Sequence, residues 1–251
     1  MKPAIQAADI CKGFGTGQRQ AAILRGVSLD VHRGETVFLV GPSGSGKTTL
    51  LSILGCILAA DSGSVKILEQ EITRLTPDQL TVFRRNYLGF IFQSFNLFPT
   101  LSALDNIRLA LTMRGTPMKE ASERGEELLN QVGLWHRQHL RPSKLSTGEC
   151  QRIAVARALA VNPAILFADE PTASLDATNG RAILKLLTRL VQDRGVTLVV
   201  VTHDNRIFPF ADRILRLEDG QLTHEWARPA DSRQGTLSQI ELPDFLTEQV
   251  A

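Results

Sequence analysis

The chain has few cysteines, no long apolar run and no excess of either charge, and each absence excludes a class of protein. Its 251 residues include three cysteines, Cys11, Cys56 and Cys150, which are odd in number, widely separated and form no metal-binding pattern. Free thiols of this kind suit a reducing cytoplasm better than a secreted, disulfide-bonded protein. No apolar run approaches the roughly 20 residues that a membrane helix needs.

The charges are balanced as well, at 28 basic against 26 acidic residues, for a formal net charge of +2. Without a long basic run, nucleic acid is not expected as the main partner. Residues 1–6 lack the apolar core of a signal peptide. We therefore expect a soluble chain, with one large domain or two closely packed lobes, that attaches to a membrane only through another subunit.

The most informative stretch present is residues 41–48, GPSGSGKT, which fits the phosphate-loop pattern GxxxxGK[ST]. Its glycines let successive backbone N–H groups point at phosphate oxygens. Lys47 is expected to reach the outer phosphates and Thr48 to bind Mg²⁺. The alternative is a glycine-rich turn with a coincidental lysine. The predicted ATP contacts here are Gly41, Pro42, Ser43, Gly44, Ser45, Gly46, Lys47, Thr48 and Thr49.

The flanks of this loop predict the strand–loop–helix unit that the motif requires. Residues 36–40 are almost wholly apolar and indicate a buried parallel strand. Residues 49–58 are apolar without strict alternation, which favours a buried helix. Upstream, alternating apolar residues from Val27 to Val31 predict a half-exposed strand.

Two further buried strands are predicted to end in polar side chains. Residues 164–168 precede Asp169 and Glu170, and residues 196–202 precede His203. In a nucleotide-binding α/β sheet the ligand lies at the carboxyl ends of the strands. Asp169 is then placed to hold Mg²⁺, Glu170 to polarise the attacking water and His203 to touch the outermost phosphate. The alternatives are an acidic turn and a structural histidine.

Residues 145–149, LSTGE, precede a strongly helix-forming stretch, residues 150–159. Ser146 with Glu149 three residues later fits a capping box, which is a complete structural explanation. A serine and a glycine at a helix N-terminus also make an anion site. The residues alone leave both interpretations open.

The ordered set of motifs resembles the ATP-binding subunit of an ABC transporter, over nearly the whole chain to about residue 225. The motifs are the phosphate loop, Gln93, residues 145–149, Asp169 with Glu170, residues 174–176 and His203, in the order and approximate spacing of that family. The resemblance implies an α/β P-loop NTPase fold, with a mainly parallel sheet and flanking helices, an antiparallel β subdomain and an inserted α-helical signature subdomain. It places a nucleotide-binding core at about 1–85 and 160–225, a helical lobe at about 86–159 and a C-terminal extension at 226–251.

The resemblance also implies roles for individual residues. Gln93 is the lobe-linking glutamine that senses Mg²⁺ and the γ-phosphate. Ser146 and Gly148 belong to the signature motif, which contacts ATP bound to the partner subunit, so that a homodimer closes around two MgATP. Asp176 lies in a loop that crosses between the two sites. The aromatic residue that stacks on adenine matches Phe14, because Phe in place of Tyr keeps the stacking face. The implied catalytic set is Glu170, His203 and Lys47, and the implied metal set is Thr48, Gln93 and Asp169.

The signature departs from the usual Leu-Ser-Gly-Gly-Gln, because Thr147 replaces the first glycine, Glu149 replaces the glutamine and Cys150 follows. Thr147 places a β-branched side chain where the backbone approaches phosphate, which is expected to reduce ATP affinity or turnover. The serine and the second glycine remain, so ATP hydrolysis is still expected.

Within the family the chain resembles the macrolide-export and lipoprotein-release branch, through residues 88–93, 96–97 and 168–172. Residues 55–58 and 202–208 lean towards ATPases of glycolipid-type exporters that work with a membrane-fusion protein. The implied partners are a second copy and a transmembrane permease, with no nucleic acid, at the cytoplasmic face of the inner membrane. A lipid, lipoprotein or hydrophobic compound is the implied cargo. The rivals are a soluble ABC ATPase of DNA repair or translation, and a kinase or GTPase that uses the same phosphate loop.

Aromatic residues crowd around Gln93. Phe90 and Phe92 are expected in the core of the helical lobe. Residues 95–98 follow no regular period and end at Pro99. We expect them to line the groove that receives a cytoplasmic helix of the membrane subunit.

Overall fold

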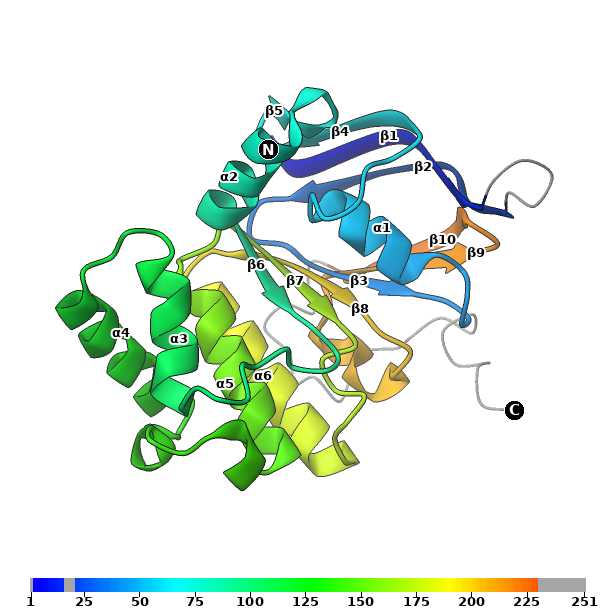
Figure 1. The fold of residues 1–251 in the computed structure, drawn as a ribbon. Helices are drawn as coiled ribbons and strands as arrows, with labels where there is room; N and C mark the ends of the chain where they lie inside the picture. Colours follow the sequence, from blue (N-terminus) through cyan, green and yellow to red (C-terminus); the bar gives the residue numbers. More distant parts are fainter. Residues whose placement is uncertain (1, 16–20, 230–251) are drawn as a thin grey trace. The chain divides into compact units, whose positions relative to one another are not determined.

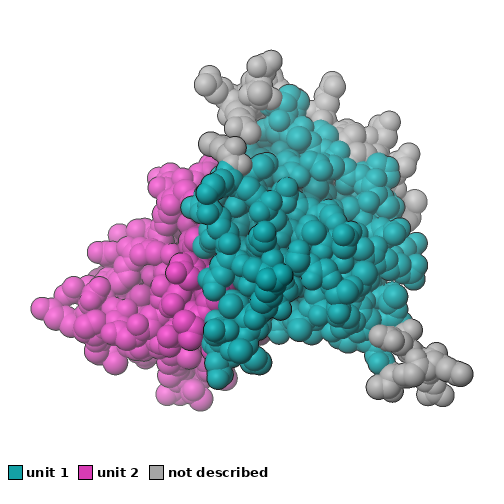
Figure 2. Space-filling view, turned by 90° about the horizontal axis from the view of Figure 1, so that it is seen from above, with its two compact units in different colours: residues 1–80, 197–251 teal, residues 81–196 magenta. Residues whose placement is uncertain are grey.

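The computed structural model describes residues 2–15 and 21–229. The chain divides into two compact units, of which unit 1 comprises residues 1–80 with 197–251 and unit 2 comprises residues 81–196. Figure 2 shows which atoms belong to each unit. The predicted helical lobe, 86–159, lies inside unit 2, and its bounds stay a prediction. The expected C-terminal extension lies outside the described residues from position 230 onwards.

Unit 1 contains two groups of strands with helix α1 packed against both (Figure 1). The first group is an antiparallel sheet in the order β2-β1-β4-β5. In the second group, β3 pairs in parallel with β8 and β9, while β10 is antiparallel to β9. The bounds are β1 Pro3–Phe14, β2 Ala21–His32, β3 Thr36–Val40, α1 Lys47–Leu54, β4 Ser62–Ile67, β5 Gln70–Glu71, β8 Thr197–Val201, β9 Arg213–Glu218 and β10 Gln221–Ala227.

Unit 2 contains a parallel pair of strands, β6 and β7, and a set of helices in which α5 contacts α3, α4, α6 and β6. Helix α5 is buried along ten of its positions, including an unbroken run from Ile153 to Ala156. The bounds are β6 Leu88–Ile91, α3 Ala103–Thr112, α4 Met118–Gln131, α5 Thr147–Ala160, β7 Ile165–Asp169 and α6 Ala177–Asp193. Helix α2, Pro77–Tyr87, runs from unit 1 into unit 2.

The strands predicted around the phosphate loop are confirmed. All five residues of β3 are buried, as a parallel strand covered on both faces requires. On β2, Val27 and Val31 are buried while alternate positions are exposed. None of the helices in residues 2–15 and 21–229 is long and apolar enough to cross a membrane.

The helix predicted over 49–58 is correct in type but wrong at its end. Helix α1 stops at Leu54, with Gly55 as its C-cap. Cys56 then takes a left-handed backbone with φ 59°, and the N–H of Ile57 folds back to the carbonyl oxygen of Ser52 at 2.8 Å. The apolar side chains continue past this turn, which is why their pattern alone overestimated the helix.

Candidate nucleotide site

The phosphate loop leaves β3 with three glycines at positive φ, namely Gly41 at 144°, Gly44 at 81° and Gly46 at 102°. Two of these positions also have no room for a side chain. A Cβ on Gly41 would lie 2.0 Å from the carbonyl oxygen of Leu217, and one on Gly46 would lie 2.8 Å from Leu24 Cδ2. The glycines therefore fix a backbone that other residues would not adopt.

The interior of this loop fits a phosphate group. Lys47 is buried, and its ammonium donates hydrogen bonds to the carbonyl oxygens of Gly41 and Pro42, both at 2.8 Å. The hydroxyl of Ser45 is buried and has no hydrogen-bond partner among the described residues. No side chain caps the first turn of α1, whose positive dipole end faces the loop. A cation, an unsatisfied hydroxyl and an uncapped helix start thus converge, as anion binding requires.

The other residues predicted to bind phosphate lie in α1 and after β8. Thr48 is exposed and Thr49 is half-buried in the first turn of α1. Strands β3 and β8 run in parallel, with Leu39 opposite Val201. The phosphate loop and His203, which is exposed, therefore leave the same edge of this strand pair. The sequence-based prediction that they share an edge is correct.

Phe14 lies at the end of β1 with 48% of its surface exposed. The ammonium of Lys12 is 5.6 Å from the centroid of its ring. Asp61 binds both Lys12 Nζ, at 2.6 Å, and the N–H of Gly13, at 2.7 Å, and these hydrogen bonds lower the pKa of Asp61. An exposed aromatic face beside a fixed cation can accept a nucleotide base by stacking.

In unit 2, Asp169 and Glu170, predicted at a strand end, leave the same edge of the β6–β7 pair as Gln93, whose role came from the family resemblance. Ile91 lies opposite Ala168 in parallel register. Gln93 follows β6 and is exposed, while Asp169 ends β7 and is half-buried. Glu170 has a left-handed backbone with φ 48°, which is rare for this residue type and concentrated at functional sites. The pattern of apolar residues gave no signal for that backbone strain.

The capping box predicted at the start of α5 is present. The N–H of Ser146 donates to Glu149 Oε2 at 2.8 Å, and the N–H of Glu149 donates to Ser146 Oγ at 3.2 Å. The first of these bonds lowers the pKa of Glu149 although partial burial opposes it, and the charges of Arg137 and Arg152 add to the lowering. Glu149 Oε1 is 3.3 Å from Arg137 Nε. The carboxylate in the signature therefore has its counter-charge within this unit.

The fold gives a structural reason for Asp176 but none for a glycine at position 148. A Cβ added to Gly148 would find its nearest neighbours at 3.9–4.0 Å, so packing within this chain does not demand glycine there. Asp176 is the N-cap of α6 and accepts the N–H groups of Thr178 and Asn179, both at 3.0 Å. Those hydrogen bonds, the one from Asn179 most strongly, lower its pKa. Its structural role is therefore clear.

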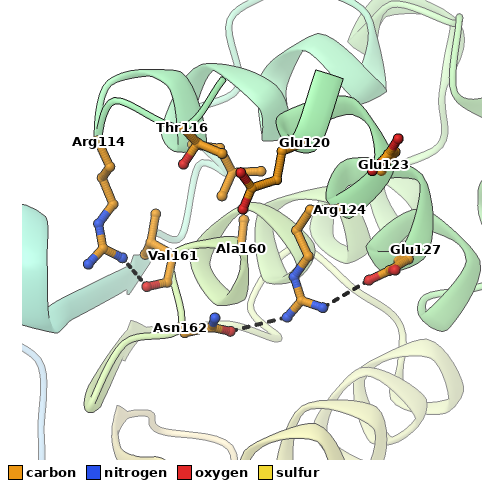
Figure 3. A pocket seen from close by; sticks show the side chains of 10 residues that line it. Arg114, Thr116, Glu120, Glu123, Arg124, Glu127, Ala160, Val161 and Asn162 are labelled. Carbon is orange, nitrogen blue, oxygen red and sulfur yellow. Dashed lines mark hydrogen bonds and ion pairs between the residues drawn. The ribbon is translucent and has the colours of Figure 1, made fainter. Parts of the chain in front are cut away.

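A hollow of about 390 Å³ in unit 2 has a different character (Figure 3). Its lining comes from α3, α4 and the end of α5, and includes none of the residues predicted to bind ATP. Arg114 donates to the carbonyl oxygen of Val161, and Arg124 bridges Asn162 and Glu127. These arginines bind the carboxyl end of α5, where the helix dipole favours cations.

Comparison with known proteins decides the family of this site. The family model described as ABC transporter matches residues 24–173. The chain belongs to the ABC transporter family. It is 45% identical over 222 residues to an uncharacterized ABC transporter ATP-binding protein of Thermotoga maritima, covering 88% of this chain and 94% of the relative. It is 41% identical over 222 residues to the lipoprotein-releasing system ATP-binding protein LolD of Geobacter metallireducens, covering 88% and 99%.

A longer relative is the macrolide export ATP-binding/permease protein MacB of Syntrophobacter fumaroxidans, at 42% identity over 232 residues. The alignment covers 92% of this chain but only 32% of that protein. Among solved structures, the ATP-binding cassette MJ0796, dimeric and bound to ADP and Pi, superimposes with a TM-score of 0.83. It is 39% identical and the match covers 89% of this chain and 98% of that one.

These matches confirm the predicted P-loop ABC fold and the ABC-type ATPase activity, and they remove the kinase or GTPase alternative. The resemblance to macrolide-export and lipoprotein-release systems is confirmed at the level of relatives. One feature near the site was missed by sequence reasoning. Arg157 of α5 donates to main-chain oxygens of the loop that carries Gln93. A side chain that binds backbone about 60 residues away leaves no local signature in a sequence.

Proposed function

We propose that two copies of this chain close around two MgATP and drive a membrane permease that exports or extracts a lipid, lipoprotein or hydrophobic compound. The match to LolD over almost the full length of both chains is the observation that carries the proposal. The match to MacB supports it, because there the same cassette is joined to a permease. The chain would then act at the cytoplasmic face of the inner membrane. A glycolipid cargo and a membrane-fusion protein are the narrower form of this proposal.

In the proposed reaction, water attacks the γ-phosphate in line, and catalysis consists mainly of positioning and charge stabilisation. The loop from Gly41 to Thr49 and Lys47 hold the phosphates, and His203 contacts the outermost one. Mg²⁺, where bound, neutralises phosphate charge, and Thr48, Gln93 and Asp169 are its proposed ligands. Glu170 orients and polarises the water.

The remaining assignments concern the base and the partner. Phe14 stacks on adenine. Ser146 and Gly148 contact ATP held by the second copy, while Asp176 lies between the two sites. The dimeric, ADP-bound relative supports this arrangement.

The proposed dimer cycle is tested with Glu170→Gln. This variant should bind ATP, hydrolyse it at least about 100-fold more slowly and accumulate as a dimer on size-exclusion chromatography, because closure no longer ends in hydrolysis. Asp193→Asn, on the last turn of α6, is the matched carboxylate control, and its rate of ATP hydrolysis and its dimer content should equal those of wild type. Hydrolysis at the normal rate by Glu170→Gln would overturn the assignment.

The proposed coupling to a permease is tested by co-purification with the neighbouring membrane protein, followed by ATPase stimulation with candidate lipids and lipoproteins. Phe98, which is 49% exposed, and the half-buried Phe95 are proposed to line the docking groove. Phe95→Ala and Phe98→Ala should both lower permease-stimulated ATPase, and Phe98→Ala should leave basal ATPase intact. Phe90, whose ring stacks on Phe167 at 5.4 Å, is half-buried rather than fully in the core and serves as the comparison position.

A further inference from the structure

The loop after β6 contains two consecutive residues with a strained backbone. Phe95 has φ 60° and Asn96 has φ 47°. Asparagine tolerates this left-handed conformation, but a bulky residue such as phenylalanine rarely adopts it, because its Cβ approaches a carbonyl oxygen. Such a turn persists only where surrounding groups hold it, and backbone strain of this kind concentrates at switch and active-site segments.

Two polar side chains hold the loop, each at a different place. Asn106 of α3 is fully buried, accepts the N–H of Phe98 at 2.8 Å and donates to the carbonyl oxygens of Phe98 and Leu101. It fixes the far end of the loop. Arg157 of α5 donates to the carbonyl oxygen of Phe95 at 2.8 Å and to that of Asn96 at 2.5 Å. The two carbonyls that Arg157 holds are those of the two strained residues.

Arg157 is an unusual choice for a purely structural contact. Its side chain is half-buried, and this burial lowers the pKa of its guanidinium. Across residues 2–15 and 21–229, no carboxylate forms an ion pair with it, so the two carbonyl oxygens are its hydrogen-bond acceptors there. Even partial burial of a charge without a counter-ion is unfavourable, which indicates that the position of this cation matters.

The strained turn is directly connected to Gln93. The N–H of Phe95 donates to the carbonyl oxygen of Phe92 at 3.0 Å, and that of Asn96 donates to Ser94 at 2.6 Å. Residues 92–96 therefore form one hydrogen-bonded unit with Gln93 inside it. Releasing the carbonyls of Phe95 and Asn96 would let this unit relax and carry the amide of Gln93 with it.

We propose that Arg157 is a positioning residue that holds the Phe95–Asn96 turn in its strained form and thereby places Gln93 for MgATP. The second half of this inference rests on the proposed function, in which Gln93 senses Mg²⁺. Arg157 belongs to the same helix as the signature residues at its start. Movement of α5 would thus be transmitted to Gln93 through two hydrogen bonds.

The test compares Arg157→Met with Arg194→Met by hydrogen–deuterium exchange of the full chain. Arg194 is a matched control in the same unit, since burial also lowers its pKa and it donates to Leu159 and Gln131. Arg157→Met should speed amide exchange at Phe95 and Asn96 about 10- to 100-fold, as expected on losing hydrogen bonds to a charged group, but not at Phe98, which Asn106 holds. Arg157→Lys, which keeps the charge and a donor, should lie in between. Unchanged exchange at Phe95 and Asn96, or an equal rise in Arg194→Met, overturns the proposed hold.

The catalytic half is tested by ATPase titrations with Mg²⁺ and with ATP. In Arg157→Met the Mg²⁺ concentration for half-maximal rate should rise about tenfold and kcat should fall, as in Gln93→Ala, while KM for ATP changes little. The positioning of Gln93 is overturned if Arg157→Met exchanges faster but keeps the wild-type Mg²⁺ requirement and kcat, while Gln93→Ala shows a raised Mg²⁺ requirement. If Gln93→Ala instead keeps a normal Mg²⁺ dependence, the role proposed for Gln93 is overturned. The exchange result then still decides whether Arg157 holds the Phe95–Asn96 turn. Arg157→Lys supplies the same measurements if Arg157→Met does not fold.

Discussion

Ser146 and Glu149 bind each other's backbone N–H at the start of α5, so the signature serine is already engaged within its own chain. The hydroxyl of Ser146 also lies 3.1 Å from Glu149 Oε2. Both interpretations left open by the sequence concern this one hydroxyl. The capping box is observed, and contact with a partner's nucleotide would require Ser146 Oγ to share its hydrogen bonds with phosphate.

The pH dependence of this cap is predictable. The pKa of Glu149 is lowered in the folded chain, so the ionised cap stabilises the fold fully above the ordinary glutamate pKa, 4.5, and loses that contribution as the pH falls through the lower folded value. Wild type should therefore be more stable than Glu149→Gln at pH 7, by an amount that shrinks below about pH 4. Urea denaturation from pH 7 to pH 3 measures the difference.

A matched control is Glu123→Gln, at an exposed position on α4. Its stability relative to wild type should change little over the same pH range. If Glu149→Gln and Glu123→Gln showed the same pH dependence, the cap would not be the source of the effect.

Variants of the phosphate loop should change the affinity for ATP without lowering the stability of the fold. Nothing among the described residues bonds to the buried hydroxyl of Ser45, so Ser45→Ala should not lower the free energy of unfolding and should raise it slightly. Its affinity for ATP should fall about 2- to 10-fold, because one neutral hydrogen bond to phosphate is lost. Lys47→Ala should lose roughly 10- to 100-fold or more, because a charged donor is removed. Calorimetric titration with ATP, paired with urea denaturation, gives both quantities; a destabilised Ser45→Ala that binds ATP normally would contradict the prediction.

The base-binding end makes a different prediction. Phe14→Ala should raise KM for ATP about tenfold with little change in kcat, because stacking on a base contributes about 1–3 kcal/mol. Phe14→Tyr should retain wild-type KM. Asp61→Asn should give a smaller rise, since Asp61 holds Lys12 and the N–H of Gly13 beside the ring. Steady-state kinetics with ATP measure these KM values. Equal KM for ATP in Phe14→Ala and wild type would show that Phe14 does not bind the base.

The sequence predicted those parts of the fold and site that depend on short-range patterns. The capping box joins Ser146 and Glu149, which are only three positions apart, and β3 is a continuous apolar run, so both are readable from neighbouring residues. The left-handed backbones of Phe95 and Glu170 are imposed by the surrounding structure and oppose the residues' own preferences. No sequence pattern therefore predicted them. The contact of Arg157 with Phe95 spans 62 positions and depends on how α5 packs.

Gly148 should show opposite effects on stability and activity. Because a Cβ there has 3.9–4.0 Å of clearance, Gly148→Ala should stabilise α5 by up to about 1 kcal/mol. If the signature backbone approaches the partner's nucleotide, the added methyl should nevertheless lower ATPase activity about tenfold or more, which corresponds to about 1.4 kcal/mol of lost stabilisation. Gly180→Ala on α6, where a Cβ would lie 3.4 Å from Thr172, is the control and should keep its activity. Thermal unfolding measures the stability and ATPase assays measure the activity. Full activity in Gly148→Ala would show that the signature backbone at this position does not contact the nucleotide.

Thr147 provides the converse experiment. It is exposed at the first position of α5, where the resemblance to the family implies a glycine in place of this β-branched side chain. Thr147→Gly should raise ATPase activity several-fold by allowing closer approach, while lowering helix stability by less than about 1 kcal/mol. Thr147→Ser, which removes only the methyl group, should give a smaller gain, and Thr147→Val, which keeps the branch without the hydroxyl, should give none. A gain in Thr147→Val equal to that in Thr147→Gly would show that the hydroxyl, and not the bulk of the side chain, limits turnover.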